Sequence, residues 1–155
     1  MVPYGCGLPS DEQAPSVLQD KCQVYVWGSN SSHQLTEDVQ EKLLVPKLAL
    51  SLTNVQQVEA GQYCTFFIHT NGTVSACGKG SYGRLGLGDS SNQQTPKKLP
   101  IEARIKKVST SKGSDGHSLA VSEDGQVYSW GDGKSNFGQS FLIHQWMNLN
   151  KTYIQ

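Results

Sequence analysis

A glycine-rich segment near the middle of the chain has the residue spacing of a nucleotide-binding loop. Residues 78–83 read GKGSYG and fit the pattern G-x-G-x-x-G, which cradles a dinucleotide pyrophosphate where a strand leads into a helix. The residues that follow, 84–88, read RLGLG and are poor helix formers. Without that helix, no helix N-terminus is present to hold the phosphates. We therefore expect the glycines to serve tight turns, and we predict no cofactor.

Other features could carry chemistry, but none has the arrangement that the chemistry needs. Gly133–Ser135 reads like the end of a phosphate-binding loop, yet Tyr128 stands where that loop requires its first glycine. No serine, cysteine or lysine is paired with a base in the sequence, so no catalytic residue is predicted. The histidines lack metal-ligand spacing, so no metal site is predicted either; they are His33, His69, His117 and His144.

The cysteines and the ends of the chain bear on its location. The four cysteines form no C-x-x-C pair, and Cys64 and Cys77 lie inside apolar runs, so buried free thiols are favoured. The N-terminus lacks a basic segment followed by an apolar one, and no apolar run reaches the roughly 18 residues of a membrane span. A cytoplasmic location and no membrane span are therefore expected.

A group of basic residues lies between positions 97 and 112, although the whole chain balances 13 basic against 13 acidic residues. The group could form a stripe for an acidic partner or for nucleic acid. Solvated strand edges are the favoured explanation, because no aromatic residues suited to base stacking interleave with the charges. The basic residues are Lys97, Lys98, Arg104, Lys106, Lys107 and Lys112.

Larger-scale order appears when the chain is compared with itself. Gly28, Gly78 and Gly131 each end a short apolar run, at steps of 50 and 53 residues (78 − 28 and 131 − 78). Other landmarks keep the step of 50 or 53, namely Leu35/Leu85, Pro46/Pro96, Val55/Ile105, Val58/Val108 and Gly72/Gly125. A period of this size predicts propeller blades or a solenoid, in which each unit buries its apolar face only against a neighbour.

Runs with strand character recur in the same order within the period. Asn71-Gly72 and Asp124-Gly125 fall between the last two runs of their units, where an Asx-Gly pair supplies the positive φ angles of a hairpin turn. The sequence therefore predicts an all-β fold. The predicted runs are 23–27, 55–60, 65–69, 73–77, 105–110, 117–122 and 126–130.

The number of runs predicts part of a ring. About four extended segments per unit is the number in one propeller blade, and a ring closes with about 4–8 blades. We therefore predict an incomplete β-propeller of about two four-stranded blades plus the start of a third. Residues 1–20 are predicted to be a flexible lead-in, 21–133 the repeats, and 134–155 a non-repeat tail. For the tail, departure from the repeat frame near Gly133 is favoured over a divergent third blade.

Two segments carry a resemblance to a known family. Residues 116–131, GHSLAVSEDGQVYSWG, resemble the repeat of the regulator of chromosome condensation, and 82–89, YGRLGLGD, resemble the glycine-rich stretch of that repeat. The resemblance covers residues 22–138. Residues 27–35 and 77–86 are most similar to the N-terminal propeller of the giant HERC ubiquitin ligases.

The resemblance implies a four-stranded blade, a seven-bladed parent ring and a HECT catalytic domain that this chain lacks. It also implies protein partners, small GTPases among them. We therefore expect a non-catalytic protein-interaction fragment of the ubiquitination pathway. The alternatives are guanine-nucleotide exchange on a small GTPase and chromatin binding through the basic residues. Thr36 departs from the family, which has glycine there, so a different turn geometry is expected at that position.

Recognition is expected at the turns 29–34, 79–84 and 112–116, because propeller loops project from a rigid sheet scaffold. Trp27 and Trp130 are expected to pack between blades, with Cys77 at the same position of the middle unit. The candidate partner-binding residues are Ser29, Asn30, Lys79, Ser81, Tyr82, Arg84, Lys112 and Asp115. The residues predicted to be structural are Trp27, Gly28, Gly78, Gly83, Gly86, His117 (through hydrogen bonds to neighbouring backbone), Gly125, Trp130 and Gly131.

Overall fold

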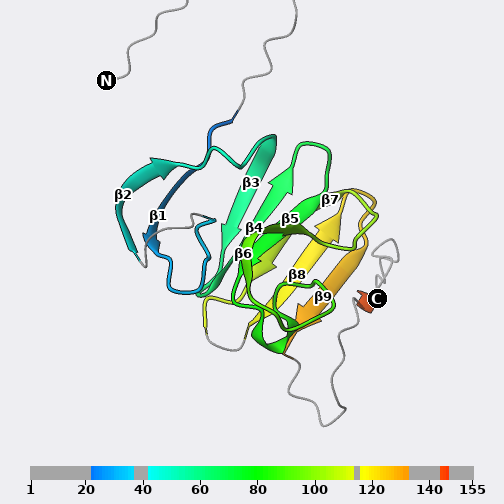
Figure 1. The fold of residues 1–155 in the computed structure, drawn as a ribbon. Helices are drawn as coiled ribbons and strands as arrows, with labels where there is room; N and C mark the ends of the chain where they lie inside the picture. The colour runs from blue at the N-terminus through cyan, green and yellow to red at the C-terminus, as the bar shows by residue number, and fades with distance from the viewer. Residues whose placement is uncertain (1–21, 37–41, 114–115, 133–143, 147–155) are drawn as a thin grey trace, which may run out of the picture.

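The computed structural model describes residues 22–36, 42–113, 116–132 and 144–146. These residues form antiparallel strands in three sheets, which lie side by side in chain order (Figure 1). The all-β prediction is confirmed. No helix among the described residues is long and apolar enough to cross a bilayer. The segments predicted as a flexible lead-in and, apart from residues 144–146, as a tail lie outside the described residues.

Among the described residues, the first sheet consists of two strands. Strand β1 (Tyr25–Ser29) pairs with β2 (Lys42–Leu48), and the register shifts between Val26 and Gly28. Alternation along β1 buries Val26 against the second sheet and leaves Tyr25 and Trp27 exposed on the other face. Pro46 lies in β2, at the outer edge, where its missing amide hydrogen costs no ladder bond.

The second sheet is a complete four-stranded blade. Its strands follow chain order: β3 (Val55–Ala60), β4 (Cys64–His69), β5 (Val74–Gly78) and β6 (Gln93–Lys98). A 3-10 turn, η1 (Ser81–Gly83), lies between the last two. All five residues of β5 are buried, because apolar layers cover both faces of this blade.

The third sheet also has four strands. These are β7 (Ile105–Thr110), β8 (His117–Ser122), β9 (Val127–Gly131) and β10 (His144–Trp146). Strand β10 pairs with β9 and lies within the segment predicted to be a non-repeat tail, so the tail contributes the fourth strand of this blade. In the described part of the chain, the sheet with fewer than four strands is therefore the first.

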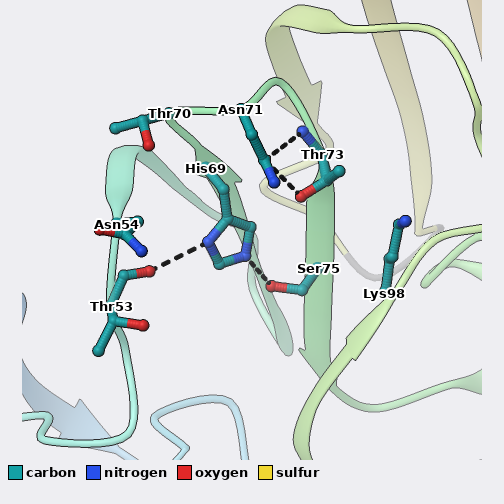
Figure 2. A pocket seen from close by; sticks show the side chains of 8 residues that line it. All are labelled: Thr53, Asn54, His69, Thr70, Asn71, Thr73, Ser75 and Lys98. Atoms are coloured by element: carbon teal, nitrogen blue, oxygen red, sulfur yellow. Dashed lines mark hydrogen bonds between the residues drawn. The ribbon is translucent and has the colours of Figure 1, made fainter.

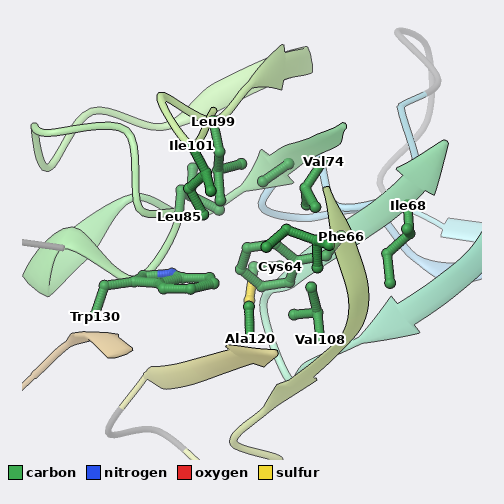
Figure 3. Packing of buried hydrophobic residues seen from close by; sticks show 12 residues of the cluster. Cys64, Phe66, Ile68, Val74, Leu85, Leu99, Ile101, Val108, Ala120 and Trp130 are labelled. Atoms are coloured by element: carbon green, nitrogen blue, oxygen red, sulfur yellow. The ribbon is translucent and has the colours of Figure 1, made fainter. Parts of the chain in front are cut away.

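Two apolar layers join the sheets. Figure 3 shows the layer between the second and third sheets, where Phe66 and Ile68 meet Val108 and Ala120, with Trp130 at one end. A second layer joins the first sheet to the second; it consists of Val24, Val26, Ala49, Leu52, Val55, Phe67 and Cys77. Each sheet therefore buries an apolar face against a neighbouring sheet, as the repeat period predicts.

The repeat also fixes the backbone at its turns. Gly72 and Gly125 have φ angles of 81° and 83°, and their amides donate to His69 and Ser122, which confirms both hairpin turns. Gly28, Gly78 and Gly131 take φ of 102°, 113° and 108°, a region that side chains rarely adopt. Gly83 and Gly86 also have positive φ, 68° and 70°. The predicted structural role of these glycines is therefore explained by their positive φ angles.

Thr36 corrects one expectation about turn geometry. Its φ is 63°, close to the 70° of Gly86 at the same repeat position, so the turn keeps its shape although glycine is replaced. A β-branched residue is strained in this conformation. Among the described residues, the Thr36 hydroxyl oxygen is buried without a hydrogen-bond partner. The first unit therefore keeps the family turn at an energetic cost.

Candidate protein-binding surface

The three predicted recognition turns lie at the same end of the sheets. The first turn follows Ser29 at the end of β1, and the second follows Gly78 at the end of β5, opposite Cys64 at the start of β4. The third turn precedes His117 at the start of β8, which is antiparallel to β9 and so begins where β9 ends. The turn after β1 reaches the second sheet, because the Gln34 carbonyl accepts a hydrogen bond from the Thr65 hydroxyl at 2.7 Å. We call this end of the sheets the loop rim, made of the described residues 29–36, 59–63, 79–84, 111–113 and 116.

The segment 79–84 is held tightly in the middle of the loop rim. The Lys79 amide donates to the Tyr63 carbonyl at 2.8 Å, and the Gly80 amide donates to the Asn92 side chain at 2.9 Å. The Lys79 ammonium lies 5.1 Å from the centre of the Tyr63 ring, within cation–π range. Tyr82 takes a positive φ of 63° inside η1, and its side chain is 62% exposed. A rigid backbone thus presents an exposed aromatic ring.

Arg84 lies under this surface instead of on it. The residue is 2% exposed, its Nε donates to the Ser81 carbonyl at 3.0 Å, and its guanidinium lies 5.9 Å from the centres of the Tyr63 and Tyr82 rings. A Cβ placed on Gly116 would come within 2.7 Å of the guanidinium carbon, so the turn after β7 packs directly on it. The prediction of Arg84 as a partner-contacting residue is therefore wrong; it joins the loops from below.

Asn30 is a second correction of the same kind. It is 4% exposed, and its side-chain oxygen accepts from the Leu35 amide at 3.0 Å, which closes the turn after β1. Ser29 is exposed, and its hydroxyl lies 3.3 Å from that of Ser31. Asn30 therefore shapes the turn, and Ser29 is available at the surface.

The turn 112–116 adds an exposed cation to the loop rim. The Lys112 ammonium lies 2.8 Å from a carboxylate oxygen of Glu59 and also donates to the Ala60 carbonyl. Its side chain is 67% exposed, so this ion pair contributes little to stability and serves mainly to position the lysine. Asp115 lies outside the described residues. The accessible candidates on the loop rim are Ser29, Lys79, Ser81, Tyr82 and Lys112.

Equivalent residues latch neighbouring blades together. The Trp130 indole N–H donates to the Arg84 carbonyl at 2.9 Å, and its ring meets the edge of Phe66 at a centroid distance of 5.8 Å. Cys77 occupies the same repeat position, and its thiol donates to the Gln34 carbonyl at 3.6 Å. The predicted inter-blade role of Trp130 and Cys77 is thereby visible in the structure.

Trp27 does not share that environment. It is 59% exposed, whereas Trp130 is 8% exposed, because the described residues include no blade on the outer side of the first sheet. Within the described part of the chain, Trp27 therefore does not pack between blades as predicted. His117 also differs from expectation: its side chain is exposed, and its carbonyl accepts from the Ser111 amide at 2.9 Å.

A pocket at the opposite end of the second sheet was not predicted from the sequence. Figure 2 shows His69 between a Thr53 carbonyl, 3.3 Å from Nδ1, and the Ser75 hydroxyl, 2.7 Å from Nε2. Since the carbonyl can only accept, Nδ1 is the donor to Thr53. The open pocket has a volume of about 360 Å³ and is lined by Thr53, Asn54, His69, Thr70, Asn71, Thr73, Ser75 and Lys98.

The His69–Ser75 pair has the separation of a base and a nucleophile, but its setting indicates a structural bond. Ser75 is 6% exposed and belongs to the buried strand β5. The third blade has Ser122 and Tyr128 at the same positions, so the pair is not a feature of the repeat. The two residues flank the Asn71–Gly72 turn, and a diagonal pairing across that predicted hairpin was the signal available in the sequence.

The basic residues are divided between two strand edges. Lys97 and Lys98 lie on β6, the last strand of the second sheet, and Lys106 and Lys107 lie on β7, the first strand of the third. All four are exposed. Arg104 pairs with Glu123 at 2.9 Å, and both side chains are more than half exposed. Charges on outer strands match the favoured explanation of protected sheet edges.

The sequence of the chain matches that of a known repeat. Two family profiles, both described as regulator of chromosome condensation (RCC1) repeat, match the chain, one over residues 23–68 and 71–121 and the other over 105–139. The human E3 ubiquitin-protein ligase HERC2 is 38% identical over 118 residues, which cover 73% of this chain and 2% of the ligase. The human probable E3 ubiquitin-protein ligase HERC6 is 36% identical over 133 residues, 84% of this chain and 13% of that protein.

A solved structure shares the fold. The crystal structure of Prp20p from Saccharomyces cerevisiae, a protein with binding properties to Gsp1p and histones, superimposes with a TM-score of 0.59 and 26% sequence identity. The match covers 70% of this chain and 26% of Prp20p. The chain therefore spans only a small part of the proteins that it resembles, in agreement with an incomplete propeller.

Proposed function

Because the chain belongs to the family of regulator of chromosome condensation (RCC1) repeats, we propose that it is a protein-binding propeller segment of a HERC-type ubiquitin ligase. The observation that carries the proposal is the loop rim, where the segments that contain Tyr63, Tyr82 and Gly116 meet around buried Arg84. Tyr82 and Lys112 project from this rigid base and offer an aromatic ring and a cation, groups that suit a protein surface with acidic residues.

The relatives support a binding role in general terms. HERC2 and HERC6 carry the repeat within ubiquitin ligases, and Prp20p has binding properties to Gsp1p and histones. In this proposal the segment selects proteins for a ligase whose catalytic part lies elsewhere in the parent protein. Exchange activity on a small GTPase and a cytoplasmic location stay predictions. The division of the basic residues between two edges weakens the case for chromatin binding.

A rim-specific substitution tests the proposal. In quantitative co-purification, the amount of cellular partner protein bound by the double variant Tyr82→Ala, Lys112→Ala should be about tenfold lower than that bound by the parent. This is the loss expected when a central aromatic ring and a cation are removed. Leu50→Ala is the matched control, since Leu50 is 81% exposed and lies outside the loop rim. If the double variant and Leu50→Ala bind the same partners in equal amounts, the loop rim is not the binding surface.

A further inference from the structure

We propose that the pocket around His69 binds the phosphate group of a small molecule. Its volume of about 360 Å³ falls within the range of about 300–1,000 Å³ for small-molecule sites. The described residues that line it supply hydroxyl groups, two amides, an imidazole and the ammonium of Lys98, and none of them is a carboxylate (Figure 2). This lining does not suit an apolar ligand. It suits an oxyanion, and a lysine ammonium is a point charge that binds phosphate.

Several donors of the pocket have no partner of their own. The Asn71 side-chain oxygen accepts from the Thr73 amide at 3.0 Å and from the Thr73 hydroxyl at 2.8 Å, which leaves the Asn71 amide nitrogen unused. Within the described part of the chain, the side chains of Asn54, Thr70 and Lys98 make no hydrogen bond or ion pair. An ammonium, two amides and a hydroxyl are therefore free to donate to an anion in this pocket.

The third blade has the same backbone at this end of its sheet. The Thr70 amide donates to the Asn54 carbonyl at 2.8 Å, and the Glu123 amide donates to the Arg104 carbonyl at 2.8 Å. These hydrogen bonds show that the two pairs of residues are equivalent. In the third blade the two side chains form an ion pair with each other at 2.9 Å. In the second blade the equivalent side chains are an amide and a hydroxyl without partners.

Other side chains of the third blade also differ from those that line the pocket. Tyr128 occupies the position of Ser75, and its hydroxyl donates to the Gln126 side chain at 2.8 Å. Asp124 occupies the position of Asn71 and accepts from the Ser122 hydroxyl. The third blade thus places a large ring and a carboxylate where the second has small or neutral groups. The repeat does not require the open, carboxylate-free pocket, which is particular to the second blade.

Nuclear magnetic resonance of the ¹⁵N-labelled full chain tests the proposal at constant ionic strength. Glycerol 3-phosphate is the probe, glycerol is its neutral counterpart, and inorganic phosphate is the third ligand. The amide signals of residues 70–73 and 98 should shift in a saturable manner with both phosphates and should not shift with glycerol. Tighter binding of glycerol 3-phosphate would identify the ligand as a phosphate monoester, and equal affinities would identify it as free phosphate. Both results support the proposal.

Substitutions locate the site. Lys98→Ala should weaken binding by about tenfold, because it removes a charge-assisted hydrogen bond. Lys97→Ala is the matched control, since Lys97 is exposed on the same strand, carries the same charge and does not line the pocket. Asn71→Asp should weaken binding by at least as much, because a negative oxygen replaces the free donor. Its turn should fold, since the third blade has Asp124 before the glycine of the same turn.

Three results would overturn the proposal. They are the absence of saturable shifts with either phosphate, equal affinity for glycerol and glycerol 3-phosphate, and equal weakening by Lys97→Ala and Lys98→Ala. Circular dichroism establishes that the variants are folded, so that lost binding reports on the pocket. The proposal does not depend on the proposed function, because the pocket and the loop rim lie at opposite ends of the second sheet.

Discussion

Trp130 and Trp27 occupy one repeat position in two environments, and their replacement by alanine should have very different effects. Trp130 is 8% exposed, donates a hydrogen bond to the Arg84 carbonyl and packs edge-on against Phe66. Removing a buried tryptophan side chain costs about 3–5 kcal/mol. Of this, the hydrogen bond accounts for about 1 kcal/mol and the aromatic contact for about 0.5–1.5 kcal/mol. Trp27→Ala should change the free energy of unfolding by less than about 0.5 kcal/mol, because Trp27 is 59% exposed.

The assay is urea denaturation followed by far-UV circular dichroism, with the free energy of unfolding taken from the linear extrapolation. Because domains are stable by only about 5–15 kcal/mol, Trp130→Ala can leave too little folded baseline to fit. Trp130→Phe avoids this problem: it keeps a ring beside Phe66 but removes the N–H donor, and should cost about 1–2 kcal/mol. Equal losses for alanine at the two positions would refute the argument that a neighbouring blade decides the energy of this residue.

Further predictions concern the turns and the buried thiols. Thr36→Gly should raise the free energy of unfolding by about 1 kcal/mol in the same assay, because it relieves a strained positive φ and removes a buried, unpaired hydroxyl; a loss of stability would contradict the strain argument. Burial raises the pKa of Cys77 to about 12, and desolvation also raises the pKa of Cys64. The folded state therefore binds more protons than the unfolded state between about pH 9 and 12, and stability should fall as pH rises through this window; Cys77→Ala should reduce the slope, and an unchanged slope would show that other groups cause it. Gly78→Ala should destabilise the chain far more than Gly28→Ala, since only Gly78 faces a neighbouring carbonyl; equal thermal midpoints would mean that the positive φ alone determines the cost.

The repeat period made most strands predictable from the sequence. The runs 55–60, 105–110 and 117–122 coincide with β3, β7 and β8, because each has an apolar pattern on a half-buried sheet. Strand β6 has the sequence QQTPKK and shows no such pattern. It is the outer strand of its sheet and buries none of its residues. The strand therefore needs no apolar side chains, and its sequence gives no pattern from which to predict it.

The surface residues were harder to predict, because a period says nothing of which neighbours are present. Trp27 has the sequence context of a core residue and is exposed only because the blade outside it is missing from the described chain. Arg84 looks like a cation of an exposed loop, yet it is buried beside Tyr63, Tyr82 and Gly116. Its burial depends on contacts between segments more than 30 residues apart, which local sequence does not encode.

The latch between blades uses a peptide carbonyl as its acceptor at both Gln34 and Arg84. Such an acceptor is the same for every amino acid, so the side chain at that position can diverge without loss of the contact. The donor is tryptophan in the third unit and cysteine in the middle unit, and both junctions keep the hydrogen bond. After a tandem duplication, the side chains of each repeat can therefore change independently. The contact between two blades then requires no compensating substitution in the neighbouring blade.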